Sequence, residues 1–168
     1  MLYFIRHAAT DGNLRNVWVG HDDQPITPVS QIELMQTAVI LSQINFSRIY
    51  TSPLRRAIST AKAIKQYQKS QPELLIEPAL IERDFAEFEG CNKSAENRLL
   101  MEMSAAVESV EEIKNRLLPF IQPLFYSAEN ILLVSHSGIF RCLRKIGLSS
   151  HHSKSNLKNL EWVILTKD

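Results

Sequence analysis

Histidine and arginine residues stand at the ends of two apolar runs in this chain. Arg6 and His7 end the run at residues 2–7, and His136 ends the run at 131–136. In an open α/β sheet, the carboxyl ends of neighbouring strands meet at one edge, where ligands bind. Guanidinium and imidazole groups gathered there form an anion site, and the planar, bidentate donors of arginine suit phosphate. The sequence therefore predicts phosphate chemistry.

Further polar residues fall at the same predicted edge. Ser52 ends the run at 48–52, Arg56 follows that run, and Ser137 follows His136. Arg56 lies in the first turns of a predicted helix, whose unpaired N–H groups and dipole attract anions. Each residue alone has a structural explanation, since Ser52 could simply be a helix N-cap. Their coincidence at one edge favours an anion pocket.

Strand-like runs alternate with helical periods along the chain. The runs that carry the two histidines are nearly continuous in apolar residues, which is typical of strands buried on both faces. The alternation predicts an α/β fold, a three-layer α/β/α sandwich with a mostly parallel central sheet. We expect one domain, residues 1–168. The predicted strands cover residues 2–7, 48–52, 74–78, 131–136 and 161–166.

Two helices with proline at the first position are predicted after the first and second strands. Thr27 is the expected N-cap of one, before Pro28, and Ser52 is the expected N-cap of the other, before Pro53. The first helix is predicted to bury a single apolar stripe. That stripe comprises Ile32, Leu34, Met35, Ala38, Val39 and Leu41.

The second half of the chain contains two more predicted helices. One runs from about residue 107 to 125, and Pro119 and Pro123 inside it predict a kink or a break. The other follows Gly138 and ends near Gly147. The segment 90–106 fits the alternation least well, and we interpret it as a short cap insertion with a helical excursion.

Composition excludes several classes of protein. The formal net charge of the 168 residues is +1, which gives no electrostatic basis for binding nucleic acid or an anionic membrane. Cys91 and Cys142 form no CxxC pair, and no apolar run is long enough to span a bilayer, so a reduced, cytoplasmic protein is expected. No cofactor is expected. The histidines, including His21 and the pair at 151–152, lack the spacing of a metal site.

Ordered motifs in the chain resemble the histidine phosphatase superfamily, the phosphoglycerate-mutase-like enzymes. RHAATDGN at 6–13 looks like the family's RHGxTxxN signature, and TSPLRRAISTA at 51–61 looks like its SxLxRAxxTA helix. LIERDFAEFEG at 80–90 is similar to its LxE…EG segment, and LVSHSG at 133–138 resembles its second-histidine motif. GHDDQPIT at 20–27 and ESVEEIKNRLLPF at 108–120 also follow the family pattern, so the resemblance covers essentially the whole chain.

The resemblance implies a phosphoglycerate-mutase-like fold and a role for each matched residue. His7 would be the nucleophile, with Arg6, Arg56 and His136 as the clamp on the phosphoryl group. Glu82 would donate the proton to the leaving group, and it must therefore be protonated in the first step, which partial burial favours. Further phosphate or substrate ligands are expected at Thr10, Asn13, Ser52 and Ser137.

The predicted function is metal-independent hydrolysis of a small phosphorylated metabolite through a phosphohistidine intermediate. A mutase must shield its phosphoenzyme from water. The cap expected here is short, and it has only Lys93 and Arg98 as basic residues, which favours hydrolysis over mutase activity. Two alternatives remain: a phosphohistidine or phosphoprotein phosphatase, and a catalytically silent phosphate-binding protein. Ala8, Ala9 and Ser137, which depart from the family motifs, would support the silent protein. The sequence does not reveal the oligomeric state.

Overall fold

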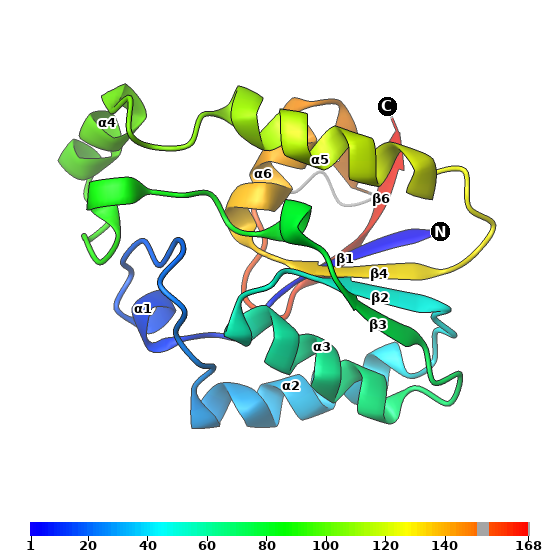
Figure 1. The fold of residues 1–168 in the computed structure, drawn as a ribbon. Coiled ribbons are helices and arrows are strands. Elements are labelled where there is room, and N and C mark those ends of the chain that lie inside the picture. Colours follow the sequence, from blue (N-terminus) through cyan, green and yellow to red (C-terminus); the bar gives the residue numbers. More distant parts are fainter. Residues whose placement is uncertain (151–154, 168) are drawn as a thin grey trace.

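The centre of the molecule is a six-stranded sheet with helices on both faces (Figure 1). A computed structural model describes residues 1–150 and 155–167. The strand order is β3-β2-β4-β1-β6-β5. Strands β3, β2, β4 and β1 are parallel, whereas β6 and β5 are antiparallel to their neighbours. The strands are β1 (Leu2–Arg6), β2 (Arg48–Thr51), β3 (Glu73–Ile76), β4 (Ile131–Ser135), β5 (Leu148–Ser150) and β6 (Trp162–Lys167).

The register of the parallel strands places three carboxyl ends at one edge of the sheet. Arg6 of β1 lies opposite Ser135 of β4, and Thr51 of β2 lies opposite Val134 of β4. The residues that follow these strands therefore begin at the same level. This is the edge at which the sequence predicts the anion pocket.

The helices form two outer layers, which confirms the predicted α/β/α sandwich. α2 (Pro28–Leu41) and α3 (Arg55–Tyr67) cover one face of the sheet, and α5 (Val110–Leu124) and α6 (Ser137–Lys145) cover the other (Figure 1). The remaining helical elements lie around the carboxyl edge or lead toward it. They are α1 (Asp11–Leu14), α4 (Ala95–Met103) and the 3₁₀ turns η1 (Pro78–Leu80) and η2 (Ala86–Phe88).

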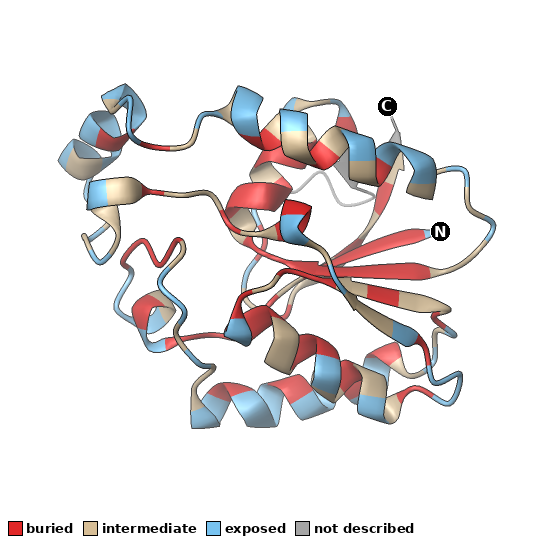
Figure 2. Ribbon diagram, in the orientation of Figure 1, coloured by how far each residue is buried: buried red, intermediate tan, exposed pale blue. Residues whose placement is uncertain are grey.

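Alternating side chains of the central strands hold the two layers to the sheet. Phe4 and Leu133 pack against the α5 and α6 layer, whereas Ile5 and Leu132 pack against the α2 and α3 layer. All of them are fully buried, as the central strands in Figure 2 show. The near-continuous apolar runs of β1 and β4 thus reflect burial on both faces.

The predicted single stripe on α2 is wrong. Leu34, Ala38 and Leu41 are buried against the sheet, whereas Ile32, Met35 and Val39 are between 50% and 64% exposed. At 3.6 residues per turn the two sets point roughly 120° apart around the helix, so one contact face cannot bury both. The N-terminus of α2 is as predicted, because Thr27 caps it by accepting a hydrogen bond from the Ser30 N–H.

Three other local expectations need correction. α3 begins at Arg55 rather than at Pro53, and its N-cap residue, Leu54, makes no side-chain capping bond. α5 continues through Pro119 and Pro123 without a break. Both prolines are exposed, so the carbonyls that lose their N–H partners face water, and that loss costs less. β5 was not expected from the sequence.

The short cap insertion expected at 90–106 includes α4, which Ser94 caps. Trp18, Phe85, Met101 and Val107 form a small separate cluster of buried residues that joins α4 to the loops near the sheet edge. In the described part of the chain, no helix is both long and apolar enough to cross a membrane.

Candidate active site

His7 follows β1 and is only 3% exposed. Its Nδ1 lies 2.7 Å from the Ala8 carbonyl oxygen, which can only accept a hydrogen bond, so Nδ1 carries the proton. Nε2 is then the atom with the free lone pair. Burial, followed by the charges of Arg56 and Arg6, holds the pKa of His7 well below its ordinary value of 6.5. The ring is therefore neutral at neutral pH, with Nε2 available as a nucleophile.

Arg6 and Arg56 are anchored by backbone carbonyls rather than by carboxylates. Arg6 donates to the Leu157 carbonyl oxygen at 2.8 Å, and Arg56 donates to the carbonyl oxygens of Gly20 and Asp22 at 2.6 and 2.8 Å. Carbonyls fix the guanidinium groups in place, and neither arginine forms a salt bridge within the described residues. The buried Nε of each arginine has no partner within the described structure. Both groups can therefore bind an incoming anion.

Burial also affects the protonation of the two arginines. It lowers the pKa of Arg6 to about 10 and the pKa of Arg56 below its ordinary value, against the opposing effect of Glu82. Arg6 thus keeps its charge at neutral pH. A charge held in a poorly solvated site interacts strongly with a phosphoryl group.

His136 follows β4, and its ring centroid lies 4.9 Å from that of His7. Its Nε2 is 2.7 Å from the Ser52 hydroxyl oxygen, and its buried Nδ1 has no partner in the described structure. Burial first, and then the neighbouring His7 and arginines, hold the pKa of His136 well below 6.5. His136 is fully buried, and it is not among the residues that line the cavity beside His7. Ser52, predicted as an N-cap and a phosphate ligand, is fully buried and does not line the cavity; its hydroxyl contacts His136 and accepts the Leu54 N–H at 3.3 Å.

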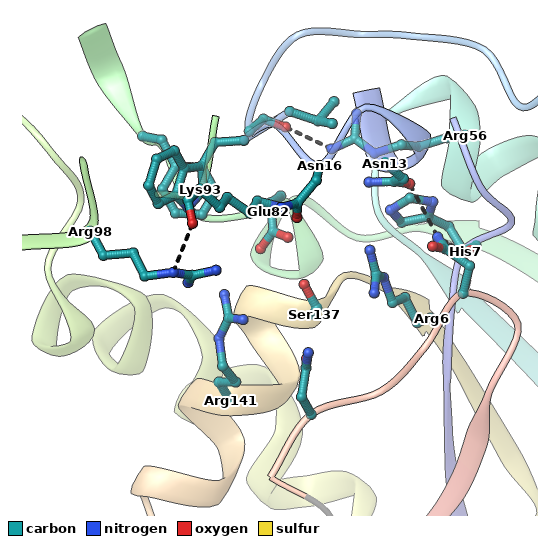
Figure 3. A pocket seen from close by; sticks show the side chains of 16 residues that line it. Arg6, His7, Asn13, Asn16, Arg56, Glu82, Lys93, Arg98, Ser137 and Arg141 are labelled. Atoms are coloured by element: carbon teal, nitrogen blue, oxygen red, sulfur yellow. Dashed lines mark hydrogen bonds between the residues drawn. The ribbon is translucent and has the colours of Figure 1, made fainter. Parts of the chain in front are cut away.

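Glu82 follows η1, and Figure 3 shows its side chain near the middle of the site. It is 7% exposed, and its carboxylate accepts hydrogen bonds from the backbone N–H groups of Arg83 at 2.9 Å and Gly138 at 3.2 Å. A Cβ atom added to Gly138 would come within 2.2 Å of Glu82 Oε1. The glycine therefore permits the close approach of helix α6 to this carboxylate. Phe85 lines the same cavity.

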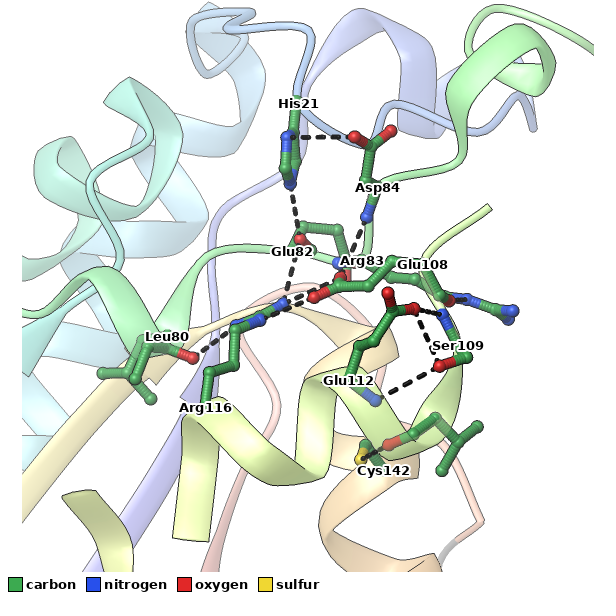
Figure 4. Close-up of polar contacts among 12 residues, drawn as sticks. His21, Leu80, Glu82, Arg83, Asp84, Glu108, Ser109, Glu112, Arg116 and Cys142 are labelled. Carbon is green, nitrogen blue, oxygen red and sulfur yellow. Dashed lines mark hydrogen bonds and ion pairs between the residues drawn. The ribbon is translucent and has the colours of Figure 1, made fainter. Parts of the chain in front are cut away.

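A network of hydrogen bonds and an ion pair holds the chain segment that carries Glu82 (Figure 4). Arg116 on α5 donates to Glu108 at 2.7 and 3.0 Å, and it also donates to the carbonyl oxygens of Ala79 and Glu82. His21 Nε2 lies 2.8 Å from the same Glu82 carbonyl. These contacts fix the backbone on both sides of Glu82. Glu108 and Arg116 both fall in the ESVEEIKNRLLPF motif.

Thr10 and Asn13 form a reciprocal N-terminal cap on α1. The Thr10 hydroxyl accepts from the Asn13 N–H at 3.4 Å, and Asn13 Oδ1 accepts from the Thr10 N–H at 3.1 Å. Thr10 is fully buried behind the cavity wall, whereas Asn13 and Ser137 line the cavity. Asn159, from the loop before β6, donates to both the His7 carbonyl and Asn13 Oδ1. Sequence patterns gave no signal for Asn159.

Most of these side chains surround one cavity of about 280 Å³. Arg6, His7 and Arg56 lie at one end of it, and Glu82 and Ser137 lie near the middle (Figure 3). Three more cations line the cavity, namely Lys93, Arg98 and Arg141. Arg141 was missed from the sequence, although it lies one helical turn after Ser137 and so on the same face of α6.

Of the three residues that depart from the family motifs, Ser137 lines the cavity and the two alanines do not. Ala8 and Ala9 do not line the cavity; the Ala8 N–H donates to Thr60 Oγ1, and the Ala9 N–H donates to Ser30 Oγ. Ala8 packs in the buried cluster under α2 and α3 and does not enter the pocket beside His7.

The described residues offer no cluster of three or more side chains suited to a metal ion. His21 is engaged with the Glu82 carbonyl, and its Nδ1 lies 3.8 Å from Asp84. His151 and His152 lie outside the described residues.

The family model for the histidine phosphatase superfamily (branch 1) matches residues 2–167. The chain therefore belongs to the histidine phosphatase superfamily, as its fold and the two histidines at the sheet edge indicate.

Curated relatives within this superfamily have different activities in their names. The chain is 28% identical over 159 residues to a 2,3-bisphosphoglycerate-dependent phosphoglycerate mutase of Cytophaga hutchinsonii, covering 85% of this chain and 75% of the relative. It is also 28% identical over 155 residues to the putative phosphoserine phosphatase 2 of Hydrogenobacter thermophilus, covering 84% and 75%.

Solved structures share the fold. A mycobacterial glucosyl-3-phosphoglycerate phosphatase complexed with VO3 aligns with a TM-score of 0.81 at 20% identity, covering 99% of this chain and 96% of that one. The phosphoglycerate-mutase-like architecture expected from the sequence is thus confirmed.

Proposed function

We propose that this protein is a metal-independent phosphomonoester hydrolase that works through a phosphohistidine intermediate on a small phosphorylated metabolite. The observation that carries the proposal is the state of His7. Its Nδ1 is bound to the Ala8 carbonyl, and its neutral ring lies beside His136 and two arginines whose Nε atoms have no partner among the described residues.

In the first step, His7 Nε2 attacks phosphorus and the P–O bond to the leaving group breaks. Arg6, Arg56 and His136 bind the equatorial oxygens, which carry the charge of the transferring group. Protonated Glu82 gives its proton to the leaving alkoxide. The products are an alcohol and phosphorylated His7.

In the second step, water attacks the phosphohistidine. Glu82, now a carboxylate, accepts the proton that the water loses, and the P–N bond breaks. Inorganic phosphate leaves, and both His7 and Glu82 return to their starting states. One carboxyl group can serve both steps because it loses its proton in the first step and regains one in the second.

The position of the cap favours water as the acceptor. Arg98 on α4 is exposed, and so are Leu99, Leu100 and Met103 of the same helix. Figure 1 shows α4 at one end of the molecule, away from the sheet, and a cap in this position would leave water free to reach the cavity that Arg98 lines. The phosphatase named among the curated relatives agrees with this reading.

A chromogenic aryl phosphate, assayed with a chelator present, tests the proposal. We expect turnover by the wild type that survives the chelator and is lost in His7→Ala. Loss of turnover on chelation would contradict the metal-independent route. Tight vanadate binding without turnover would indicate the silent phosphate-binding protein, and turnover of phosphohistidine peptides alone would indicate the phosphoprotein phosphatase.

A phosphoglycerate mutase is the second candidate, because several curated relatives carry that name. The three additional cations in the cavity are compatible with an acidic substrate of that kind. Incubating the protein with 3-phosphoglycerate and catalytic 2,3-bisphosphoglycerate separates the two activities. The hydrolase proposal predicts release of inorganic phosphate, and it fails if 2-phosphoglycerate forms much faster than phosphate.

A further inference from the structure

The turn at residues 20–22 supplies both carbonyl groups that hold Arg56. The terminal nitrogens of Arg56 donate to the Gly20 carbonyl at 2.6 Å and to the Asp22 carbonyl at 2.8 Å. Gly20 is buried and lines the cavity, and Arg56 is only 1% exposed. The orientation of this clamp residue therefore depends on the conformation of the turn.

Glu89 holds the same turn through its backbone N–H groups. One carboxylate oxygen of Glu89 accepts from the His21 N–H at 2.6 Å, and the other accepts from the Asp22 N–H at 3.1 Å. The Asp22 N–H also donates to the Val19 carbonyl at 3.0 Å, whereas the described residues offer the His21 N–H no second acceptor. Glu89 follows η2 and is half-buried. A carboxylate far along the chain thus fixes the turn that holds Arg56.

One peptide unit lies between this carboxylate and the guanidinium. The Gly20–His21 peptide donates its N–H to Glu89 and accepts Arg56 at its C=O. The two groups point in opposite directions because the peptide is trans, as are all peptides in the described part of the chain. A carboxylate at the N–H end polarises the peptide and strengthens its carbonyl as an acceptor. Glu89 therefore stabilises the position of Arg56 without occupying any of its donors.

Gly20 permits the close approach of the carboxylate. A Cβ atom added to Gly20 would collide with Glu89 Oε1, and the φ of Gly20 is +53°, in the left-handed region. Glu89 is not among the described residues that line the cavity. Burial lowers the pKa of Arg56, and the charge of Glu82 and, more weakly, that of Glu89 oppose this effect. Glu89 thus acts on Arg56 from outside the cavity.

We propose that Glu89 is a positioning residue for the phosphate clamp: it fixes the turn at residues 20–22 and thereby directs Arg56 toward the phosphoryl group. The inference rests on the proposed function, in which Arg56 binds an equatorial phosphoryl oxygen. A carboxylate in direct contact with Arg56 would occupy the donors that the phosphoryl group needs. A carboxylate one peptide away leaves those donors free.

Vanadate affinity tests the inference, because it depends on the clamp and requires no turnover. We expect Glu89→Ala to raise the dissociation constant of vanadate roughly 10- to 100-fold, since a displaced guanidinium loses charged hydrogen bonds to the anion. Glu89→Gln should recover part of the affinity, because its amide oxygen can still accept the His21 N–H. Calorimetry measures the constants, and urea unfolding shows that each variant is folded. If Glu89→Ala does not fold, Glu89→Gln serves in the same tests with a smaller effect.

Glu87→Gln is the matched control. Glu87 lies in the same 3₁₀ turn, is exposed, and accepts a hydrogen bond from the Ser104 hydroxyl at 2.7 Å. Its side chain makes no hydrogen bond to the turn at residues 20–22 in the described structure. This variant should bind vanadate as tightly as the wild type, whereas a loss equal to that of Glu89→Gln would overturn the inference.

A double-substitution cycle with Arg56→Lys shows whether Glu89 acts through Arg56. Lysine has a single ammonium group in place of the planar fork, so it cannot bind the two carbonyls in the same way. In the Arg56→Lys protein, Glu89→Ala should weaken vanadate binding by less than about twofold, because residues that act together give non-additive effects. Equal losses in the two backgrounds would overturn the inference.

The leaving group separates this role from an effect on Glu82. His21 Nε2 lies 2.8 Å from the Glu82 carbonyl, so a loosened turn could instead disturb the proton donor. If Glu89 acts through Arg56, Glu89→Ala should lower kcat/KM by the same factor for phenyl phosphate and for 4-nitrophenyl phosphate. A larger loss for phenyl phosphate would assign the effect to Glu82 and overturn the inference.

The inference and the proposed function can fail separately. Unchanged vanadate affinity in Glu89→Ala, while the wild type hydrolyses aryl phosphates, would overturn the inference and leave the phosphatase proposal intact. If the wild type binds vanadate but hydrolyses neither ester, the proposed function fails, and the vanadate cycle still decides the role of Glu89. A wild type that does not bind vanadate would overturn both.

Discussion

Arg116 and Glu108 form a bidentate ion pair next to the segment that carries Glu82. Nε and a terminal nitrogen of Arg116 donate to the two carboxylate oxygens at 2.7 and 3.0 Å, and the Arg116 and Glu108 side chains are 22% and 17% exposed. The same guanidinium also contacts the carbonyls of Ala79 and Glu82 (Figure 4). Arg116 therefore links α5 to the backbone on both sides of Glu82.

Arg116→Gln should impair proton donation more than phosphoryl transfer itself. We expect kcat to fall more for phenyl phosphate, whose leaving group needs a proton, than for 4-nitrophenyl phosphate, whose leaving group does not. The free energy of unfolding should fall by about 1–3 kcal/mol, because a partly buried pair is broken. Steady-state kinetics and urea unfolding measure the two effects.

Lys114→Gln is the matched control for Arg116, because it breaks an exposed pair with Glu111 on the same helix. It should change neither the kinetics nor the stability measurably. Equal losses of kcat for both leaving groups in Arg116→Gln would show that Arg116 is structural only.

Gly138→Ala should displace the Glu82 carboxylate. The added Cβ would lie 2.2 Å from Glu82 Oε1, far inside contact distance, so the carboxylate must move. Misplacement of a catalytic group by about 1 Å can cost about 10²-fold, and kcat should fall by that order. Vanadate affinity, measured by competitive inhibition, should be largely retained because the clamp residues are untouched. Unimpaired turnover would mean that the position of Glu82 does not matter.

Glu82→Gln keeps the size and the hydrogen-bonding oxygen of the side chain but removes its acid–base function. We expect kcat to fall roughly 10²–10⁴-fold for phenyl phosphate, with good retention of phosphate binding. Stopped assays and phosphate competition give both quantities. Parallel loss of phosphate affinity and rate would argue that Glu82 organises the pocket rather than transferring protons.

Stability should depend on pH through the two buried histidines. Their pKa values are held well below 6.5 in the folded protein, mainly by burial, whereas the unfolded chain takes up protons near 6.5. The unfolded state then binds more protons, so this contribution is complete above pH 6.5 and is lost as the pH falls below it. Each histidine should contribute a slope of about 1.4 kcal/mol per pH unit.

Urea unfolding between pH 7 and 5, in buffers free of phosphate, measures this slope. His136→Gln should reduce it by about half, since one of two equivalent contributions is removed. A free energy of unfolding that stays flat over this range would contradict the neutral, buried state of both rings.

The strand ends could be predicted from the sequence because burial on both faces leaves a simple signal. The apolar runs that end in His7 and His136 became neighbouring parallel strands, so their polar ends met as expected. Side chains that reach the site from loops and helices left no such signal. Arg141 follows Ser137 by one turn of α6 and could have been found by helical spacing, whereas Asn159 has no pattern around it.

Predictions made from local sequence patterns were incomplete or wrong where contacts between distant parts of the chain determine the position of a side chain. Ser52 has the sequence context of an N-cap, and its hydroxyl accepts a hydrogen bond from the Leu54 N–H at 3.3 Å, but the helix begins only at Arg55 and the same hydroxyl bonds to His136, which follows β4. Thr10 looks like a phosphate ligand by its place in the motif, yet its hydroxyl caps α1. The apolar residues of α2 suggested one stripe, although only the set facing the sheet and α3 is buried.

Trapping the phosphoenzyme tests the central claim most directly. The protein is mixed with an aryl phosphate, quenched at alkaline pH, where phosphohistidine survives, and digested for mass spectrometry. We predict one phosphoryl group on the peptide that contains His7, accumulating further in Glu82→Gln with a good leaving group because hydrolysis of the intermediate is slowed. A phosphoryl group on His136 instead, or turnover at full rate in His7→Ala, would contradict the account.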